Sequence, residues 1–337
     1  TAPFSLFPHS FVLFADSHTH SQEKIKMTGT TPVHSFHTEH EEMIHDIQMD
    51  YYGKQLATCS SDGNIKIYEL ANNKQTLKAT LSHSAPIWQI SWSHPKFGPL
   101  LAGCSYDASV IIWTFDAKQQ QWQKIFSYKH EASVNSIQWA PFELGLSLAA
   151  ASSDNYVSVI SYSKRTHQFE VQKFPAHTVG CNSVSWAPSA ATSSLLDTTK
   201  PYGLVRRLVT GGSDRTVKVW INKTEDDTKW KLEAKLDGHQ DWVRDVAWAP
   251  NIGLPYDTIA TCSQDGSVII WNKHDTSAKW TKKVLHTFKT VVWRCSWSET
   301  GNILAVSSGD NSVTLWKEGL SGKWENQSTL SDITDAL

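Results

Sequence analysis

Short runs of β-branched and other apolar residues recur along the chain, and each run ends six residues after an aspartate. In Asp107–Trp113 and Asp265–Trp271 the run closes on a tryptophan. Asp-Gly at 62–63 and at 265–266 is typical of the tight turn of a β-hairpin. Each repeat of a polar turn followed by an apolar run therefore predicts one β-hairpin. The six aspartates are Asp62, Asp107, Asp154, Asp214, Asp265 and Asp310.

A further apolar strand precedes each hairpin. It ends in a tryptophan nine residues after a histidine, as in His83–Trp92, whereas the first repeat has Met49 and the sixth has Phe288 in these places. Another aromatic residue returns eight to ten residues beyond the hairpin in repeats two to six. Each repeat therefore holds four predicted strands. In the second repeat they lie near 86–92, 99–104, 109–114 and 121–128.

The aspartates recur at intervals of 45, 47, 60, 51 and 45 residues. Such a period is typical of WD-repeat blades, which bury their faces only against neighbouring blades. The pattern predicts an all-β fold, a six-bladed WD-repeat β-propeller over 38–330. An N-terminal extension (1–37, with a candidate strand at 33–36) and a short tail (331–337) flank it. An insertion rich in Ser, Thr and Ala, about Ser189–Arg207, is expected to be a surface loop.

One predicted segment has no place in the repeats. The last blade already has its fourth strand near Lys323–Leu330, so the β-like segment Pro32–Phe36 has no slot there. This segment either frays or lies at a seam between the first and sixth blades. Six blades can close on themselves. An open seam would instead expose apolar faces and strand edges, which a partner could cover by adding strands. The residues leave both arrangements open.

The charge and cysteine content of the chain argue against several classes of function. The chain has 31 basic and 33 acidic residues, well mixed, and no basic stripe of the kind that binds nucleic acids. The five cysteines form no CxxC pair, and Cys59, Cys104 and Cys262 each precede a repeat aspartate by three residues. This predicts small buried side chains in a reducing compartment, rather than disulfides or zinc. No run approaches the roughly 18 apolar residues of a membrane span.

The first residues of the chain do not resemble a secretory signal. Thr1–Gln22 contains no Lys or Arg, and Phe11–Phe14 is too short for the apolar centre of a signal peptide. Met27 is a candidate native start. The glycosylation sequons at Asn222 and Asn326 are expected to be coincidental in an intracellular chain.

Repeats four and five each combine a histidine, a threonine, an aspartate and a tryptophan. Nucleophilic catalysis would need one exposed hydroxyl activated by a base. A set that is copied at blade spacing is better explained as a buried hydrogen-bond chain. We therefore expect a structural network and no enzyme activity. Its members are His177, Thr210, Asp214 and Trp220 in repeat four, and His239, Thr261, Asp265 and Trp271 in repeat five; the threonine is replaced by Gly103, Ala150 and Val306 in repeats two, three and six.

Two further groups of residues are candidate sites. His34, His37, His40 and His45 are close in sequence, but no cysteine or HxxxH pattern accompanies them, so we expect no metal. No phosphate-binding glycine motif is present, so we expect no cofactor and no small-molecule substrate. A propeller that reads peptides would need basic and aromatic residues around its channel. Trp88, Trp242 and Trp293 could contribute to such a ring, although we expect them to pack.

Longer strings of the chain resemble the Sec-thirteen family, from about Thr38 to Leu330. They are Met43–Asp46, Met49–Gly53, Leu56–Asp62, Gly180–Pro188, Asp241–Pro250 and Gly301–Val306. The resemblance implies an open propeller, completed by a blade that an α-solenoid partner donates. Residues 1–26 match nothing in the family, and Tyr68 and Ile160 replace the blade tryptophan.

The resemblance also implies partners and a location. The partners are a Sec-thirty-one-like subunit of the COPII coat and a nucleoporin of the Y-shaped pore scaffold. Expected locations are the cytoplasmic face of the endoplasmic reticulum, the nuclear envelope and a nutrient-sensing complex at lysosomes, with no direct binding of nucleic acid. The expected contact residues are Val33, His34, Ser35, Phe36, Met43, Ile44, Leu56, Ile303, Val313 and Leu315.

Overall fold

The structure is a computed structural model. It describes residues 36–71, 74–189, 205–222, 229–251, 256–274, 279–319 and 321–331. All its sheets have four antiparallel strands in chain order, and each sheet is one blade. Two short 3₁₀ turns, Pro95–Phe97 and Phe142–Leu144, follow the first strands of blades two and three.

The strand bounds follow the repeats. Blade one has β1 (Ile44–Met49), β2 (Gln55–Ser60), β3 (Asn64–Ala71) and β4 (Lys74–Ser82); blade two has β5 (Ile87–Trp92), β6 (Leu100–Ser105), β7 (Ser109–Asp116) and β8 (Gln121–Lys129); blade three has β9 (Val134–Trp139), β10 (Ser147–Ser152), β11 (Tyr156–Ser163) and β12 (Gln168–Pro175); blade four has β13 (Cys181–Trp186), β14 (Arg206–Gly212), β15 (Thr216–Asn222) and β16 (Lys231–Asp237); blade five has β17 (Val243–Trp248), β18 (Tyr256–Ser263), β19 (Ser267–His274) and β20 (Thr281–Thr287); blade six has β21 (Val292–Trp297), β22 (Ile303–Ser308), β23 (Ser312–Glu318) and β24 (Trp324–Ser331).

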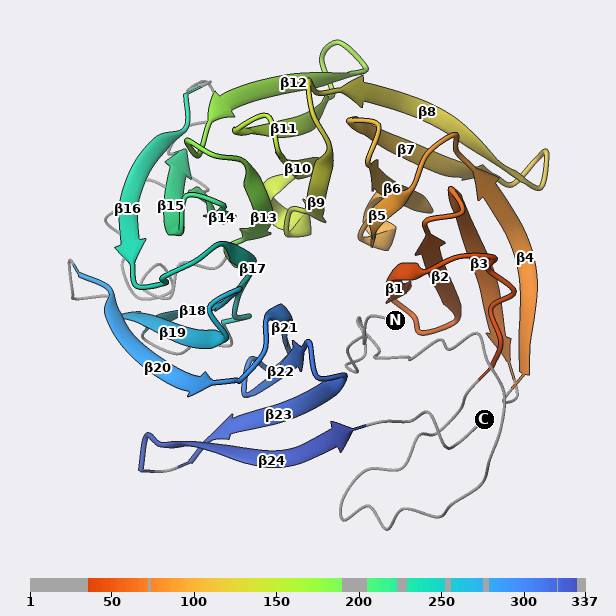
Figure 1. Ribbon diagram of the computed structural model, residues 1–337. Coiled ribbons are helices and arrows are strands. Elements are labelled where there is room, and N and C mark those ends of the chain that lie inside the picture. Colours follow the sequence, from red (N-terminus) through yellow and green to blue (C-terminus); the bar gives the residue numbers. More distant parts are fainter. Residues whose placement is uncertain are drawn as a thin grey trace, which may run out of the picture.

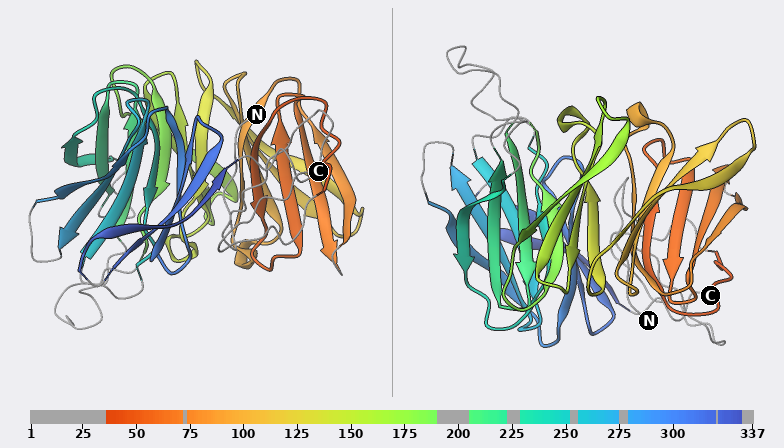
Figure 2. Two further views of the ribbon diagram at one scale, coloured as in Figure 1. Left: turned by 60° about the horizontal axis from the view of Figure 1, so that its bottom comes forward. Right: turned by 90° about the horizontal axis from the view of Figure 1, so that it is seen from above.

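The six blades stand around a central axis (Figures 1 and 2). The first strand of each blade lines the axis and the fourth lies at the circumference. The predicted six-bladed, all-β propeller is confirmed. The four strands of blade two lie within a few residues of their predicted positions.

Two sequence expectations need adjustment at their edges. The predicted surface loop about Ser189–Arg207 ends earlier than expected, because Arg206 and Arg207 pair with β15 as the start of β14. Residues 190–204 lie outside the described residues. The candidate strand at 33–36 is described only at Phe36, which is not in a strand, and most of the predicted extension also lies outside.

The hydrophobic core lies between neighbouring blades. At the junction of blades five and six, Val268 and Ile270 of β19 pack with Val292, Leu304 and Trp316 of blade six, and all five are buried. Both faces of each sheet are therefore apolar, which explains why the hydrophobic alternation along the strands is imperfect. Burying one such side chain contributes about 1.5–3 kcal/mol, so a blade depends on its neighbours.

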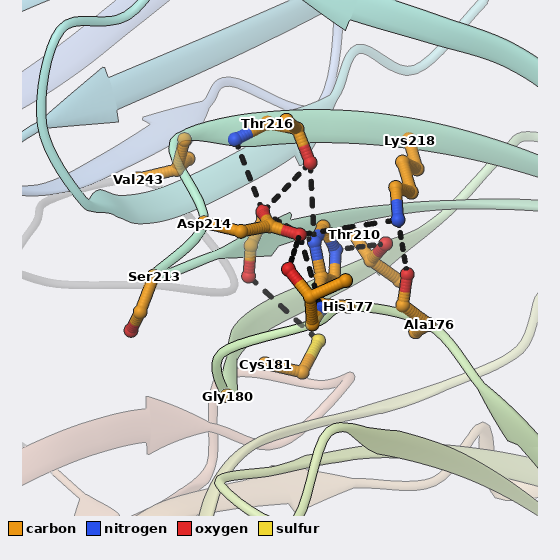
Figure 3. A network of polar contacts seen from close by, with 12 residues as sticks. Ala176, His177, Gly180, Cys181, Thr210, Ser213, Asp214, Thr216, Lys218 and Val243 are labelled. Atoms are coloured by element: carbon orange, nitrogen blue, oxygen red, sulfur yellow. Dashed lines mark hydrogen bonds and ion pairs between the residues drawn. The ribbon is translucent and has the colours of Figure 1, made fainter.

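A buried hydrogen-bond chain ties the outer turn of blade four to its strands (Figure 3). Nδ1 of His177 lies 2.8 Å from Oδ1 of Asp214, and Nε2 of His177 lies 2.8 Å from Oγ1 of Thr210. The Trp220 indole N–H donates to the same hydroxyl at 3.0 Å. Asp214 accepts a hydrogen bond from Nδ1–H of His177, so the neutral Nε2 of His177 accepts one from the Thr210 hydroxyl. The side chains of this hydrogen-bond network thus satisfy one another.

Blade five repeats this arrangement with a small change. Nε2 of His239 lies 2.8 Å from Oγ1 of Thr261, which also accepts from the Trp271 indole at 2.9 Å. Asp265 is 3.5 Å from Nδ1 of His239, and Ser267 is closer, at 2.9 Å. The structure thus joins the eight residues of the expected network within their two blades. Thr210 and Thr261 are fully buried, so neither hydroxyl can reach an external substrate.

In blades three and six, where the threonine is missing, the neighbouring strand supplies a hydroxyl, whereas in blade two Ile111 stands opposite Gly103 and supplies none. In blade three Ala150 pairs with Ser158, whose Oγ lies 2.8 Å from Nε2 of His130. In blade six Thr314 stands opposite Val306 and accepts from the Trp316 indole at 2.8 Å. In blades three and six the hydroxyl therefore keeps its place in space although it comes from the neighbouring strand.

We predict that Thr210→Val lowers the free energy of unfolding by about 1–3 kcal/mol, because His177 and Trp220 would each lose a buried hydrogen-bond partner. Urea denaturation followed by tryptophan fluorescence measures the change. Thr166→Val, at an exposed turn, serves as the control and should change stability by less than about 0.5 kcal/mol. Equal stability of the two variants would show that the network adds nothing.

The buried histidines also predict a pH dependence. Burial lowers the pKa of His40, His130 and His177, although the paired aspartates oppose this. These side chains take up protons more readily in the unfolded chain, whose histidines titrate near about 6.5. Stability should therefore be fully present above about pH 6.5 and fall as the pH drops below it. Urea denaturation between pH 8 and 5 tests this. His167→Asn, which alters an exposed histidine, should keep the dependence, and a flat profile in the unchanged protein would contradict it.

Candidate functional site

The junction between blade six and blade one differs from the other five, and we call it the seam. Neighbouring inner strands pack along one another in the sequence β1, β5, β9, β13, β17, β21, but β21 and β1 do not. In Figure 1 the ribbons of these two blades stand farther apart than those of other neighbours. The contacts that are missing at the seam can be identified from those that recur elsewhere.

From blade one to blade six, a hydrogen bond close to the axis joins each blade to the one that follows it in the chain. The third residue of an inner strand accepts from the backbone N–H of the fourth residue in the following inner strand. The five bonds are Ile90 to Asp46 at 3.1 Å, Ile137 to Gln89 at 2.7 Å, Val184 to Ser136 at 3.4 Å, Val246 to Ser183 at 3.2 Å and Cys295 to Asp245 at 3.0 Å. The blades are thereby held in register around the channel.

At the seam this acceptor is replaced by a donor. Arg294 is the third residue of β21, and a guanidinium cannot accept a hydrogen bond. It crosses to blade one and pairs with Oδ1 of Asp46 at 2.6 Å. Burial alone would lower the pKa of Arg294, but Asp46 and Asp245 raise it above its usual value. A single ion pair, between the long side chain of Arg294 and the short side chain of Asp46, thus bridges the inner edge of the seam.

A second recurring bond is also missing at the seam. The indole N–H at the end of an inner strand donates to a backbone carbonyl of the preceding blade. The pairs are Trp92 to Gln48 at 3.2 Å, Trp139 to Ser91 at 2.9 Å, Trp186 to Gln138 at 3.0 Å and Trp297 to Ala247 at 3.0 Å. Trp248 is an exception, since its buried N–H has no partner. Blade one has Met49 in this place, which has no such donor.

An apolar cluster, the seam cluster, brings together the two blades. It contains Ile44, Ile47, Leu56 and Tyr68 of blade one with Val313 and Leu330 of blade six, and the partly buried Phe36, Met49 and Leu70 pack against it. The ring of Phe36 meets that of Tyr68 edge-on, with centroids 5.2 Å apart. At the other junctions the same strand positions are covered by an adjacent blade.

Some of the expected partner-contact residues lie in the seam cluster or on the same face, and others do not. Phe36, Ile44, Leu56 and Val313 belong to the seam cluster. Leu315 and Ile303 share the face of Val313, because Ala305 and Ser307 pair with Leu315 and Val313. Met43 does not join them, since 48% of it is exposed at the start of β1. Val33, His34 and Ser35 lie outside the described residues.

Sequence reasoning missed several residues of the seam. Ile47, Tyr68 and Leu330 are core members that their blade positions could have indicated. Arg294 was also missed, although an alignment of the third residues of the inner strands shows it as the only cation among six positions. A basic side chain where every other blade has an acceptor is the sequence signal of an altered junction.

The histidines and cysteines considered as candidate ligands make structural contacts in different parts of the fold. His40 belongs to the blade-one network, and Nε2 of His45 lies 2.6 Å from Oγ of Ser61. Burial, and after it the positive charge of Arg294, lowers the pKa of His45 to about 4. Among the described residues, no three His, Cys, Asp or Glu side chains are placed to hold a metal ion. All five cysteines are buried and unpaired.

The described part of the chain contains no helix that is long and apolar enough to cross a membrane. Trp242 and Trp293, expected to pack, are 44% and 43% exposed, whereas Trp88 is half-buried.

Comparison with known families gives five matches to the WD domain, G-beta repeat, over residues 30–69, 75–114, 168–220, 230–272 and 282–317. The matched ranges leave out 115–167, which includes β9 to β11 of blade three, where Ile160 replaces the usual tryptophan.

Several curated proteins match across most of the chain. A protein transport protein SEC13 homolog A of Arabidopsis thaliana is 58% identical, covering 87% of this chain and 97% of the relative. A SEC13 homolog of Dictyostelium discoideum is 57% identical over 85% of this chain and 94% of the relative. One of Homo sapiens is 52% identical over 87% and 91%.

The ion pair at the seam gives a testable prediction. Arg294→Met should lower the free energy of unfolding by about 1–3 kcal/mol, because Asp46 is left buried without its cation, while the 37% exposure of Arg294 reduces the effect. Asp46→Asn in the same chain should restore part of the loss, because the amide oxygen can still accept from Ile90. A double-mutant cycle by urea denaturation measures the coupling. Glu69→Gln, which breaks the exposed pair with Lys78, is the control, and zero coupling between Asp46 and Arg294 would refute the bridge.

Proposed function

The chain belongs to the SEC13 family of WD-repeat propellers, and we propose that it is a structural subunit of two membrane-associated assemblies. One is the outer cage of the COPII vesicle coat, in transport from the endoplasmic reticulum to the Golgi. The other is the Y-shaped scaffold of the nuclear pore. In both, its role is mechanical and requires no catalysis.

The observation that carries this proposal is the seam. It lacks both hydrogen bonds that recur at other junctions, and the apolar faces of β1–β3 and β23–β24 meet there around Phe36, which is not part of a strand. Apolar faces with unpaired strand edges favour the addition of further strands. A three-stranded insertion from an α-solenoid partner would form a seventh blade between blades six and one.

The energetics support a permanent complex. If the docked blade buries apolar area on the order of 1,000 Å², transfer from water contributes roughly 25 kcal/mol before the costs of ordering and association are subtracted. A small fraction of this is enough for stoichiometric assembly. The partners are a Sec-thirty-one-like coat subunit at the cytoplasmic face of the endoplasmic reticulum and on vesicles, and a nucleoporin at the nuclear envelope. A nutrient-sensing complex at lysosomes is a third setting for the same docking.

A general peptide-binding adaptor is the second candidate function. The specific observation in its favour is the exposure of Trp242 and Trp293. This candidate uses a different surface and does not require the seam.

We predict that Val313→Asp abolishes assembly with a partner fragment that carries the three-stranded insertion, because a carboxylate would be buried in the seam cluster. Affinity should fall by about a hundredfold or more, as measured by co-expression, pull-down and gel filtration. Leu315→Asp, at a half-buried position of the same face, should weaken binding with less risk to folding.

The matched control is Val284→Asp on β20 of blade five, where the side chain is 51% exposed. This variant should bind as the unchanged chain does. The proposal is wrong if the unchanged propeller stays alone in gel filtration with both coat and nucleoporin fragments, or if Val313→Asp binds normally in a folded protein.

A further inference from the structure

The upper mouth of the central channel has an asymmetric lining, which we call the upper rim. It consists of the second residue of each inner strand and the residue that follows each second strand. In blade order the first set is His45, Trp88, Asn135, Asn182, Arg244 and Trp293, and the second set is Ser61, Tyr106, Ser153, Ser213, Gln264 and Gly309. The rim is small and polar on blades three and four, and aromatic or cationic elsewhere.

On blades three and four the rim satisfies its own hydrogen bonds. The Asn135 amide donates to Oγ of Ser153 at 2.8 Å and to the Cys181 carbonyl at 2.9 Å. The Asn182 amide donates to Oγ of Ser213 at 3.1 Å and to the Val243 carbonyl at 2.8 Å. These amides link neighbouring blades, and their hydrogen bonds leave few donor groups for a ligand.

Blades five and six present a cation between two exposed indoles. The Arg244 guanidinium lies over the Trp242 ring at 5.1 Å and over the Trp293 ring at 4.9 Å. The two tryptophans are 44% and 43% exposed. Stacking on the aromatic faces holds the guanidinium in one orientation. The site is therefore preorganised, with apolar surface on either side of a fixed positive charge.

Two buried donor atoms at the same place have no hydrogen-bond acceptor among the described residues. Arg244 Nε and Thr290 Oγ1 are buried without a hydrogen-bond partner among the described residues. Arg244 donates to Gln264, but it forms no ion pair within this part of the chain. Burial lowers the pKa of Arg244, and Asp241 only partly opposes this. Buried donors left unpaired in a folded protein call for an explanation, and an acceptor-bearing ligand is one.

Blade two shows that this openness is specific to blade six. There Tyr106 covers Trp88, with the rings edge-on at 6.1 Å, and the Trp88 indole donates to Ser133 at 3.0 Å. Blade six has Gly309 in the place of Tyr106, and a Cβ there would lie 3.4 Å from Nε1 of Trp293. The glycine thus leaves the N–H edge of Trp293 uncovered.

We propose that Trp242, Arg244 and Trp293 form a recognition site for an acidic linear peptide. A carboxylate of the peptide binds the Arg244 guanidinium, and apolar side chains beside it cover the indole faces. The positive charge of Arg244 selects an acidic group, and the two exposed rings require a ligand with apolar bulk, which a free inorganic anion lacks. A single cation on a chain without a basic stripe does not suit nucleic acid. The site lies at the mouth of the channel and not in the seam cluster, and it rests on the second candidate function, peptide binding, rather than on blade donation.

Selection of a phage-displayed library of twelve-residue peptides on the full chain tests this proposal. Enriched peptides should carry Asp, Glu or a free terminal carboxylate within two residues of an aromatic or aliphatic side chain. Their affinity, measured by fluorescence anisotropy, should fall about tenfold or more in Arg244→Met and in Trp293→Ala. Arg244→Lys should recover only part of it, since an ammonium cannot form the planar bidentate contact. Tyr106→Ala, on the opposite side of the rim, is the control and should bind normally.

Three results would overturn the proposal: no enrichment, enriched peptides without an acidic group, or equal binding by a folded Arg244→Met variant. The seam is tested separately in the same samples. Arg244→Met should still bind the blade-donating fragment, and a propeller loaded with that fragment should bind the peptide with unchanged affinity. Loss of fragment binding with retained peptide binding would refute the seam alone.

Discussion

A blade of this protein cannot bury its own apolar faces, and the rest of the structure follows from that constraint. Each sheet is apolar on both sides, so stability is obtained only where two blades face one another. Five junctions meet this demand with a core of interdigitated side chains and the hydrogen bond close to the axis, and four of them add the indole bond. The sixth junction has the apolar faces without those bonds, and for this reason we propose it as the place where another polypeptide docks.

The repeats and strands could be predicted from the sequence because they depend on local, periodic signals. A turn aspartate, an apolar run and a strand-ending tryptophan define each hairpin without reference to the rest of the chain. The buried network was predicted for blades four and five for the same reason. It could not be predicted for blade three, because Ser158 supplies the hydroxyl from a neighbouring strand and only the sheet register brings it to His130.

The seam was harder to predict because closure of a ring depends on how all its blades pack, and no single residue encodes it. The chain pattern left closed and open rings undecided, and the family resemblance favoured the open one. The informative residues were Arg294 and Met49, which occupy positions where other blades have an acceptor and an indole. The exposure of Trp293 was likewise hidden in the sequence, because it depends on the absence of a side chain at Gly309 in the adjacent turn.

The ion pair between Asp46 and Arg294 makes the propeller a ring that is interrupted at one junction and held together there at its inner edge. Among the described residues, the polar contact between the two ends of the ring lies at its inner edge, which is where a rotation of the two ends would pivot. Small rotations there move the circumference most, where a wedge would enter. If a partner inserts a blade as we propose, the ring would widen at its circumference while the Asp46–Arg294 pair keeps its inner edge joined.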